Sequence, residues 1–161
     1  MDADTSTGRH LGAQLMTVGG ALFVGYGIYS LLRTVLGIRY EVGVESLAES
    51  TAPDPALFDY LDHLHVAFSG FMIATGIAVV SLAWYGVRRG YPWAWSTAVL
   101  TATVALVTAI PVHFGAAFDY DHLVHLGPLY LAAVAFAAGA AVSGRALHWQ
   151  ARTPEDDNVE T

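Results

Sequence analysis

The sequence predicts an all-α fold, a four-transmembrane-helix bundle, and three observations support this prediction. Hydrophobic residues make up 55% of the 161 residues, and the mean hydropathy is +0.47, which is more apolar than an ordinary soluble domain of this size. Four apolar runs each approach or exceed the roughly 20 residues that a helix needs to cross a bilayer. Polar segments separate these runs. We therefore expect an integral membrane protein in contact with the lipid bilayer.

The chain divides into three segments by polarity. A polar N-terminal segment covers residues 1–10, the membrane domain covers 11–149, and an acidic tail covers 150–161. We expect the tail to be disordered, because polar termini that nothing holds down seldom order. Within the membrane domain, helices are expected at 11–36, 60–86, 92–114 and 122–148.

The first apolar run, 11–36, contains few polar residues, among them Gln14, Thr17 and Arg33. It is too long, and too weakly basic at its front, for a cleaved signal peptide, so we predict a spanning helix. The connection that follows, 37–59, is acidic, and ordinary solvation accounts for its carboxylates.

The third run contains Pro111, whose missing amide proton would leave the carbonyl of Val107 without its helical partner. We expect a bend near the end of this helix, beside His113. Small residues recur every four positions in three runs, which lets helix backbones approach closely in lipid. These stripes are Gly70/Ala74/Ala78, Ala94/Ala98/Ala102 and Ala135/Gly139/Ser143. They favour a tight bundle.

All seven basic residues are arginines, and fourteen carboxylates give a formal net charge of −7. An acidic chain without lysine is typical of a halophilic organism. The charge balance argues against nucleic-acid binding, which depends on clustered cations that neutralise phosphates. The absence of cysteine excludes disulfides and thiolate metal sites.

The arginines also predict the orientation in the membrane. Arg88 and Arg89 occupy the short loop between the second and third helices, and other arginines lie before the first helix and near the end of the fourth. By the positive-inside rule, we expect a multi-pass protein of the cell membrane with both termini cytoplasmic and the acidic loops outside. Arg33 and Arg39 lie on the opposite side from this expectation.

Two stretches that nearly repeat carry most of the histidines, FDYLDHLH at 58–65 and FDYDHLVH at 118–125. Each places carboxylates and two imidazoles where a polar loop meets a long apolar run, and ionisable groups there need water or partners. Duplication of a helical hairpin would explain the similarity. The two hairpins would then form a parallel repeat about an axis along the membrane normal, with both histidine clusters at similar depth.

These histidines are the candidate ligands of a cofactor, because imidazole is the commonest metal ligand in proteins. The candidate haem or cofactor ligands are His63, His65, His122 and His125. The candidate metal ligands are His63, His122, His125, Asp62, Asp121 and His113. Asp59 and Asp119 are further carboxylates that would orient a ring N–H.

The same residues have a structural interpretation, in which they cap helices and anchor the chain at headgroup depth. Haem needs one imidazole on each side of a flat slot, and a metal needs several ligands around one point. The haem hypothesis and the metal hypothesis both remain open. A bundle with ligands on facing helices is a good host for haem and for a metal.

The hairpin GVRRGYPWAW at 86–95 resembles a turn in small uncharacterised four-helix membrane proteins of bacteria and archaea. That resemblance covers about half of the chain and implies no activity. The layout, with outward-facing histidines at the start of the second and fourth helices, also looks like one half of a haem A synthase. The Glu-x-x-His-Arg signature of that family is absent at 59–64, which has neither the glutamate nor the arginine, so no catalytic residue is carried over.

The leading hypothesis is a membrane protein that binds haem or a divalent metal at its outer histidine/aspartate cluster, in electron transfer or a related role. One alternative is a non-catalytic accessory protein that packs against a second copy or a partner membrane protein. Another is a proton-linked carrier of small solutes that uses the same His/Asp pairs. No nucleophile elbow, phosphate loop or zinc-protease motif occurs, so no enzymatic reaction is assigned.

Overall fold

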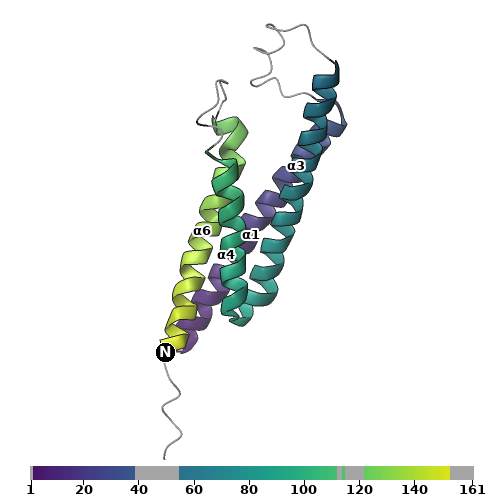
Figure 1. The fold of residues 1–161 in the computed structure, drawn as a ribbon. Helices are drawn as coiled ribbons and strands as arrows, with labels where there is room; N and C mark the ends of the chain where they lie inside the picture. Colours follow the sequence, from purple (N-terminus) through teal and green to yellow (C-terminus); the bar gives the residue numbers. More distant parts are fainter. Residues whose placement is uncertain (1, 39–54, 112–113, 115–121, 153–161) are drawn as a thin grey trace, which may run out of the picture.

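The computed structural model describes residues 2–38, 55–111, 114 and 122–152, and these ranges contain helices and no strand. Four long helices make up the fold. They are α1 (Asp2–Val35), α3 (Pro55–Ser81), α4 (Pro92–Ala109) and α6 (His122–Arg152) (Figure 1). The prediction of an all-α four-helix bundle is confirmed.

Each helix contributes a stretch that is long and apolar enough to cross a membrane. The stretches are Thr5–Val35, Asp59–Arg89, Pro92–Ala109 and Leu126–His148. Large apolar side chains such as Phe71 and Leu100 are exposed on the outside of the bundle. Lipid tails are the environment in which such a surface is stable. The chain is therefore a multi-pass membrane protein whose apolar helices contact the bilayer.

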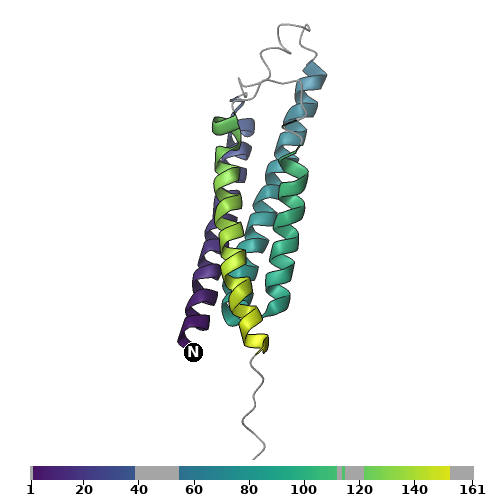
Figure 2. The ribbon, with the colours of Figure 1, turned by 90° about the vertical axis from the view of Figure 1, so that its left-hand side faces the viewer.

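The bundle has two chemically different ends. The N-terminus and the last turns of α6 lie at the same end in both views (Figures 1 and 2). The α3–α4 hairpin with Arg88 and Arg89 is also there, and we call this end the arginine end. The opposite end, where α3 and α6 begin, is called the histidine end.

Helix α1 is the central helix, and its first half packs against α6. A Cβ atom added at Gly12 would lie 2.5 Å from the backbone nitrogen of Ser143. One added at Gly19 would lie 2.8 Å from the carbonyl oxygen of Ala132. Side chains of any size are excluded at these distances, so the two backbones touch because the residues are glycines.

The second half of α1 packs against α3 in the same way. A Cβ atom added at Gly20 would lie 3.1 Å from the carbonyl oxygen of Gly76. One added at Gly27 would lie 2.9 Å from Cγ1 of Ile73. Gly19 and Gly20 are neighbours in sequence, so the face of α1 that meets α6 and the face that meets α3 are adjacent around the helix.

Helix α1 begins at Asp2 and not at Leu11. Its polar first turns continue the helix because they pack against the end of α6, where a Cβ atom at Gly8 would lie 3.6 Å from Cβ of Ala146. An added contact of this kind offsets the low helix preference of a polar, glycine-containing segment.

Helix α3 begins at Pro55 and not at Tyr60, and proline suits a first helical turn because an amide proton there would lack a partner. The stretch at 58–65 therefore lies inside a helix instead of at its start. Helix α4 ends at Ala109, before Pro111, which cannot donate the next helical hydrogen bond. The bend expected beyond it falls on residues outside those described.

A π-helical turn (Leu82–Gly86) and a 3-10 turn (Val87–Arg89) lead from α3 into the hairpin. Gly90 closes it with a φ of +87°, a left-handed conformation that only glycine adopts without strain. Helix α4 is then held on α6, because Trp95 Nε1 donates a hydrogen bond to the Ala140 carbonyl at 3.0 Å. The hairpin end of α4 is thereby fixed to the rest of the bundle.

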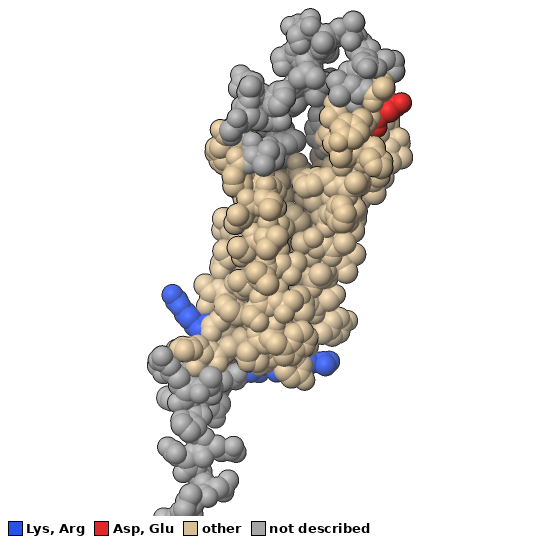
Figure 3. Space-filling model, viewed as in Figure 1, with Lys and Arg blue, Asp and Glu red and all other residues tan. Residues whose placement is uncertain are grey.

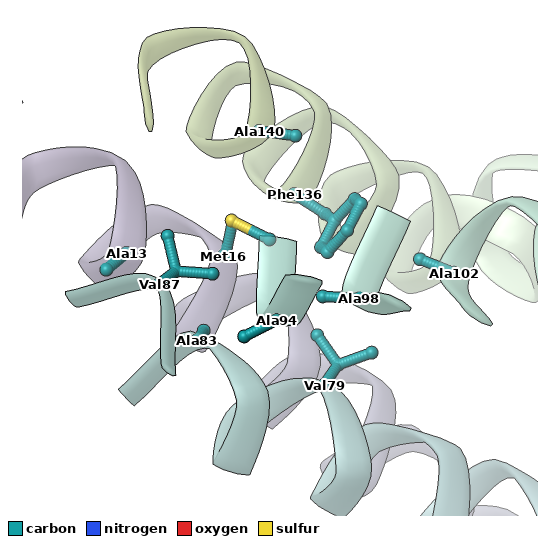
Figure 4. Packing of buried hydrophobic residues seen from close by; sticks show 10 residues of the cluster. All are labelled: Ala13, Met16, Val79, Ala83, Val87, Ala94, Ala98, Ala102, Phe136 and Ala140. Atoms are coloured by element: carbon teal, nitrogen blue, oxygen red, sulfur yellow. The ribbon is translucent and has the colours of Figure 1, made fainter. Parts of the chain in front are cut away.

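Most buried side chains in this cluster are small, which matches the close backbone contacts. They are Ala13, Met16, Val79, Ala83, Val87, Ala94, Ala98, Ala102, Phe136 and Ala140 (Figure 4). The predicted stripe Ala94/Ala98/Ala102 thus faces the core. Gly139 and Ser143 are also buried, whereas Gly70, Ala74 and Ala78 are exposed. The α3 stripe does not contribute to packing within this chain.

We predict that Gly139→Ala destabilises the bundle and that Gly70→Ala does not. The new Cβ at position 139 would lie 2.6 Å from backbone atoms of Gly12 and Met16, whereas nothing lies within 4 Å at position 70. Overpacking of this kind costs about 1–3 kcal/mol, and an alanine in open space stabilises a helix by up to about 1 kcal/mol. The measurement is unfolding in mixed detergent/SDS micelles, followed by circular dichroism. Equal stabilities of the two variants would contradict the α1–α6 contact.

Candidate functional site

The predicted histidine/aspartate cluster is distributed over two helices at the histidine end. On α3, Asp62 and His63 are exposed and His65 is half-buried. Helix α6 begins at His122. The side chains of His122 and His125, and all of His113, Asp119 and Asp121, lie outside the described part of the structure. Among the residues that are described, no three His, Asp or Glu side chains gather at one point.

His65 has a defined ring orientation. Its Nδ1 atom lies 2.8 Å from the carbonyl oxygen of Leu61. A carbonyl oxygen only accepts, so Nδ1 is the donor of this hydrogen bond, and Nε2 is the ring nitrogen that remains for another partner. A backbone carbonyl that holds Nδ1–H is the usual way in which proteins orient an imidazole for metal ligation at Nε2. His63, two residues earlier, points to a different side of the helix and lacks this combination of burial and orientation.

One helical turn below His65, a buried pair of serines joins α3 to α1. The Ser69 hydroxyl lies 3.0 Å from the Ser30 hydroxyl and 2.7 Å from the His65 carbonyl oxygen. Ser69 is fully buried and Ser30 is 4% exposed. Polar groups at such depth in a membrane protein are stable when they bond to each other. The pair therefore fixes the backbone that carries His65 against α1.

Arg33 also lies at the histidine end, where the positive-inside rule does not expect an arginine. Its Nη1 atom donates a hydrogen bond to the Tyr29 hydroxyl at 3.0 Å, and its guanidinium lies 5.7 Å from the Tyr29 ring centre. Tyr29 in turn stacks on Tyr26. Aromatic contacts of this kind stabilise a cation near the membrane interface. Arg33 is thus supported by its own helix.

The first turn of α6 lies within about one helical turn of the depth of His65. Met72 of α3 and Leu126 of α6 belong to one buried cluster, which also includes Phe23 of α1. At 1.5 Å per residue, His65 lies roughly 10 Å above Met72 and His122 roughly 6 Å above Leu126. The backbones that carry these two histidines therefore differ in depth by about one helical turn.

The middle of the bundle is narrow and its cavity has an apolar lining. A cavity of about 30 Å³ lies between the four helices. It is lined by Gly19, Gly20, Phe23, Thr75, Gly76, Val79, Ala102, Ala105, Leu106, Ala132, Ala133 and Phe136. This volume accommodates one or two water-sized groups. The glycines and alanines that could have opened a slot for a large cofactor instead bring helices together.

The arginine end contains a constellation that sequence reasoning missed. Arg88 Nε donates a hydrogen bond to Nδ1 of His10 at 3.2 Å, and the Arg88 guanidinium lies 4.6 Å from the ring centre of Trp84. Figure 3 shows the separation of charge, with arginines near this end of the visible face and a carboxylate near the other. His10 and Arg88 are far apart in sequence, so no local pattern indicated that they meet.

The Ser30–Ser69 pair was missed for the same reason, because one serine in each of two apolar runs forms no motif. Its only signal was a lone hydroxyl on an otherwise apolar helical face. Comparison with protein-family models, with curated proteins and with solved structures gave no match. The resemblance to haem A synthase therefore stays a prediction.

We predict that Ser30→Ala and Ser69→Ala are energetically coupled. Each change removes one partner of a buried hydrogen bond between helices, which is worth about 0.5–1 kcal/mol in membrane proteins. The double variant should therefore lose less stability than the two single losses added together. The matched control is Ser96→Ala, because the exposed Ser96 hydroxyl bonds only to the Trp93 carbonyl of its own helix. Strict additivity of the Ser30 and Ser69 effects in micelle unfolding would show that the pair does not interact.

Proposed function

We propose that this multi-pass membrane protein binds a haem or a divalent metal at its histidine end, through imidazoles of α3 and α6. The observation that carries the proposal is the orientation of His65. The ring is half-buried, its Nδ1–H is held by the Leu61 carbonyl at 2.8 Å, and Nε2 is the ring nitrogen that remains for a metal.

The second imidazole would come from His122 or His125. The backbone at the start of α6 lies within about one turn of the depth of His65, and ligands on separate helices are how bundles hold cofactors. Exposed Asp62 would be available to a metal as an oxygen ligand or to a bound ring as an orienting group. His63, which is exposed on another side of α3, would contribute less than His65.

The cofactor would sit at the histidine end and not in the middle of the bundle. The central cavity of about 30 Å³ has room for water-sized groups only, and its lining is apolar. When bound, a haem or redox metal supplies the ability to take up and release an electron. The chain would supply the ligands, fix the tautomer of His65 through Leu61, and hold the α3 backbone through the Ser30–Ser69 pair.

The charge separation between the two ends supports the proposed orientation in the membrane. The N-terminus, the hairpin arginines and the end of α6 share one end (Figure 1). Since basic residues favour the cytoplasmic side, both termini would face the cytoplasm of the cell and the cofactor would lie near the outer surface. Such a position suits an exchange of electrons with a partner outside the cytoplasm.

The test is an absorption spectrum, oxidised and reduced, of the detergent-purified protein, with elemental analysis of the same sample. We expect a Soret band or one bound metal per chain after expression with haem and metals supplied. His65→Ala and His122→Ala should each lower occupancy by about tenfold or more, because even partners outside the coordination sphere are worth 10–100-fold in affinity.

The matched control is His148→Ala, because His148 is exposed at the arginine end and should leave occupancy unchanged. A wild-type protein with no Soret band and no stoichiometric metal would contradict the proposal. An equal loss of occupancy in the His148 variant would do so as well, since the site would then not be the one proposed.

A further inference from the structure

We infer that the arginine end carries a binding site for the phosphate group of an anionic phospholipid. The site is built from Arg88 of the hairpin, Arg9 and His10 of α1, and the ring of Trp84. It is independent of the proposed cofactor, which would lie at the opposite end of the bundle.

Arg88 is positioned by a hydrogen bond through Nε and by a contact with an aromatic ring, so its two Nη groups are not used in that hydrogen bond. Its Nε donates to His10 Nδ1 at 3.2 Å, and its guanidinium lies 4.6 Å from the Trp84 ring centre. His10 accepts this hydrogen bond at Nδ1, which leaves its Nε2 directed away from Arg88. No carboxylate of the described residues pairs with Arg88. The two Nη groups are therefore preorganised donors at the surface.

Arg9 reaches the same hairpin from α1. A Cβ atom added at Gly90 would lie 3.1 Å from Nη1 of Arg9, and Gly90 is two residues beyond Arg88. The missing side chain of Gly90 thus gives space to the Arg9 guanidinium. Arg9 of α1 thus lies beside the hairpin that carries Arg88. The planar, multiply donating guanidinium is the side chain best matched to a phosphate group.

The surroundings favour a lipid phosphate over a free one. Tyr85, Tyr91 and Trp93 are exposed around the hairpin, and Tyr91 and Trp93 stack with ring centres 6.2 Å apart. Exposed aromatic rings of a spanning bundle mark the depth of the lipid headgroups. At that depth the abundant anion is the phosphate of an anionic lipid, and basic pockets between helices are known to hold such headgroups. The rings offer apolar surface to the acyl chains attached to it.

The proposal is tested by native mass spectrometry of the full chain in detergent, titrated with phosphatidylglycerol, with phosphatidylcholine or with inorganic phosphate. We expect phosphatidylglycerol to bind at least about tenfold more tightly than phosphatidylcholine, as charge-assisted hydrogen bonds to one phosphate would give. Arg88→Gln and Arg9→Gln should each remove most of this preference. Arg88→Lys should retain part of this preference, since the positive charge remains and the planar set of guanidinium donors is lost.

The matched control is Arg145→Gln on α6, because Arg145 is exposed and makes no contact with the hairpin site among the described residues. It should change the preference by less than about twofold. The proposal is overturned if both lipids bind equally, or if Arg145→Gln lowers the preference as much as Arg88→Gln. It is overturned equally if inorganic phosphate binds and phosphatidylglycerol does not, which would indicate a free-anion site. Circular dichroism of each variant shows whether it is folded.

Discussion

The structure depends on contact between helix backbones, and α1 makes this contact on two sides. In lipid no hydrophobic effect drives helices together, so association relies on close packing and on polar contacts between helices. Gly12 and Gly19 allow α6 to touch α1, and Gly20 and Gly27 allow α3 to do so. A side chain at Gly12 or Gly19 would force α6 away from α1. Helix α1 therefore depends on its glycines for contact with α6 on one face, and it packs against α3 on the adjacent face.

This central position connects the two polar ends of the bundle. At the histidine end, α1 supplies Ser30, which bonds to Ser69 and so holds the α3 segment that carries His65. At the arginine end, α1 supplies His10, which accepts a hydrogen bond from Arg88. Between these ends the described core is mainly apolar and contains a small cavity. The histidines and arginines discussed above lie at the two ends, whereas the buried Ser143 hydroxyl bonds to a carbonyl of its own helix.

The fold was predictable because hydropathy and length are local properties of the sequence. Four apolar runs predicted four helices, whereas the early starts at Asp2 and Pro55 depended on contacts that the sequence does not display. The stripe at Gly70 looked like the others but is exposed, because spacing alone does not show which face of a helix meets a neighbour.

The candidate site was predictable only in part. The histidines were conspicuous as ionisable residues beside apolar runs. The sequence did not show that the His65 ring is the one held by a backbone carbonyl, because this depends on the α3 face on which His65 lies. The bonds of Ser69 to Ser30 and of Arg88 to His10 join residues distant in sequence, so only the packed structure shows them.

Cysteine cross-linking tests the central role of α1 most directly, because the chain contains no cysteine of its own. The pairs are Gly8→Cys with Ala146→Cys, where the Cβ atoms would be 3.6 Å apart, and Ser30→Cys with Ser69→Cys, where the hydroxyls are 3.0 Å apart. We predict that each pair forms an intramolecular disulfide in membranes. Gly8→Cys with Gly70→Cys, at opposite ends, should not. Failure of either close pair, or cross-linking only between chains, would contradict the account.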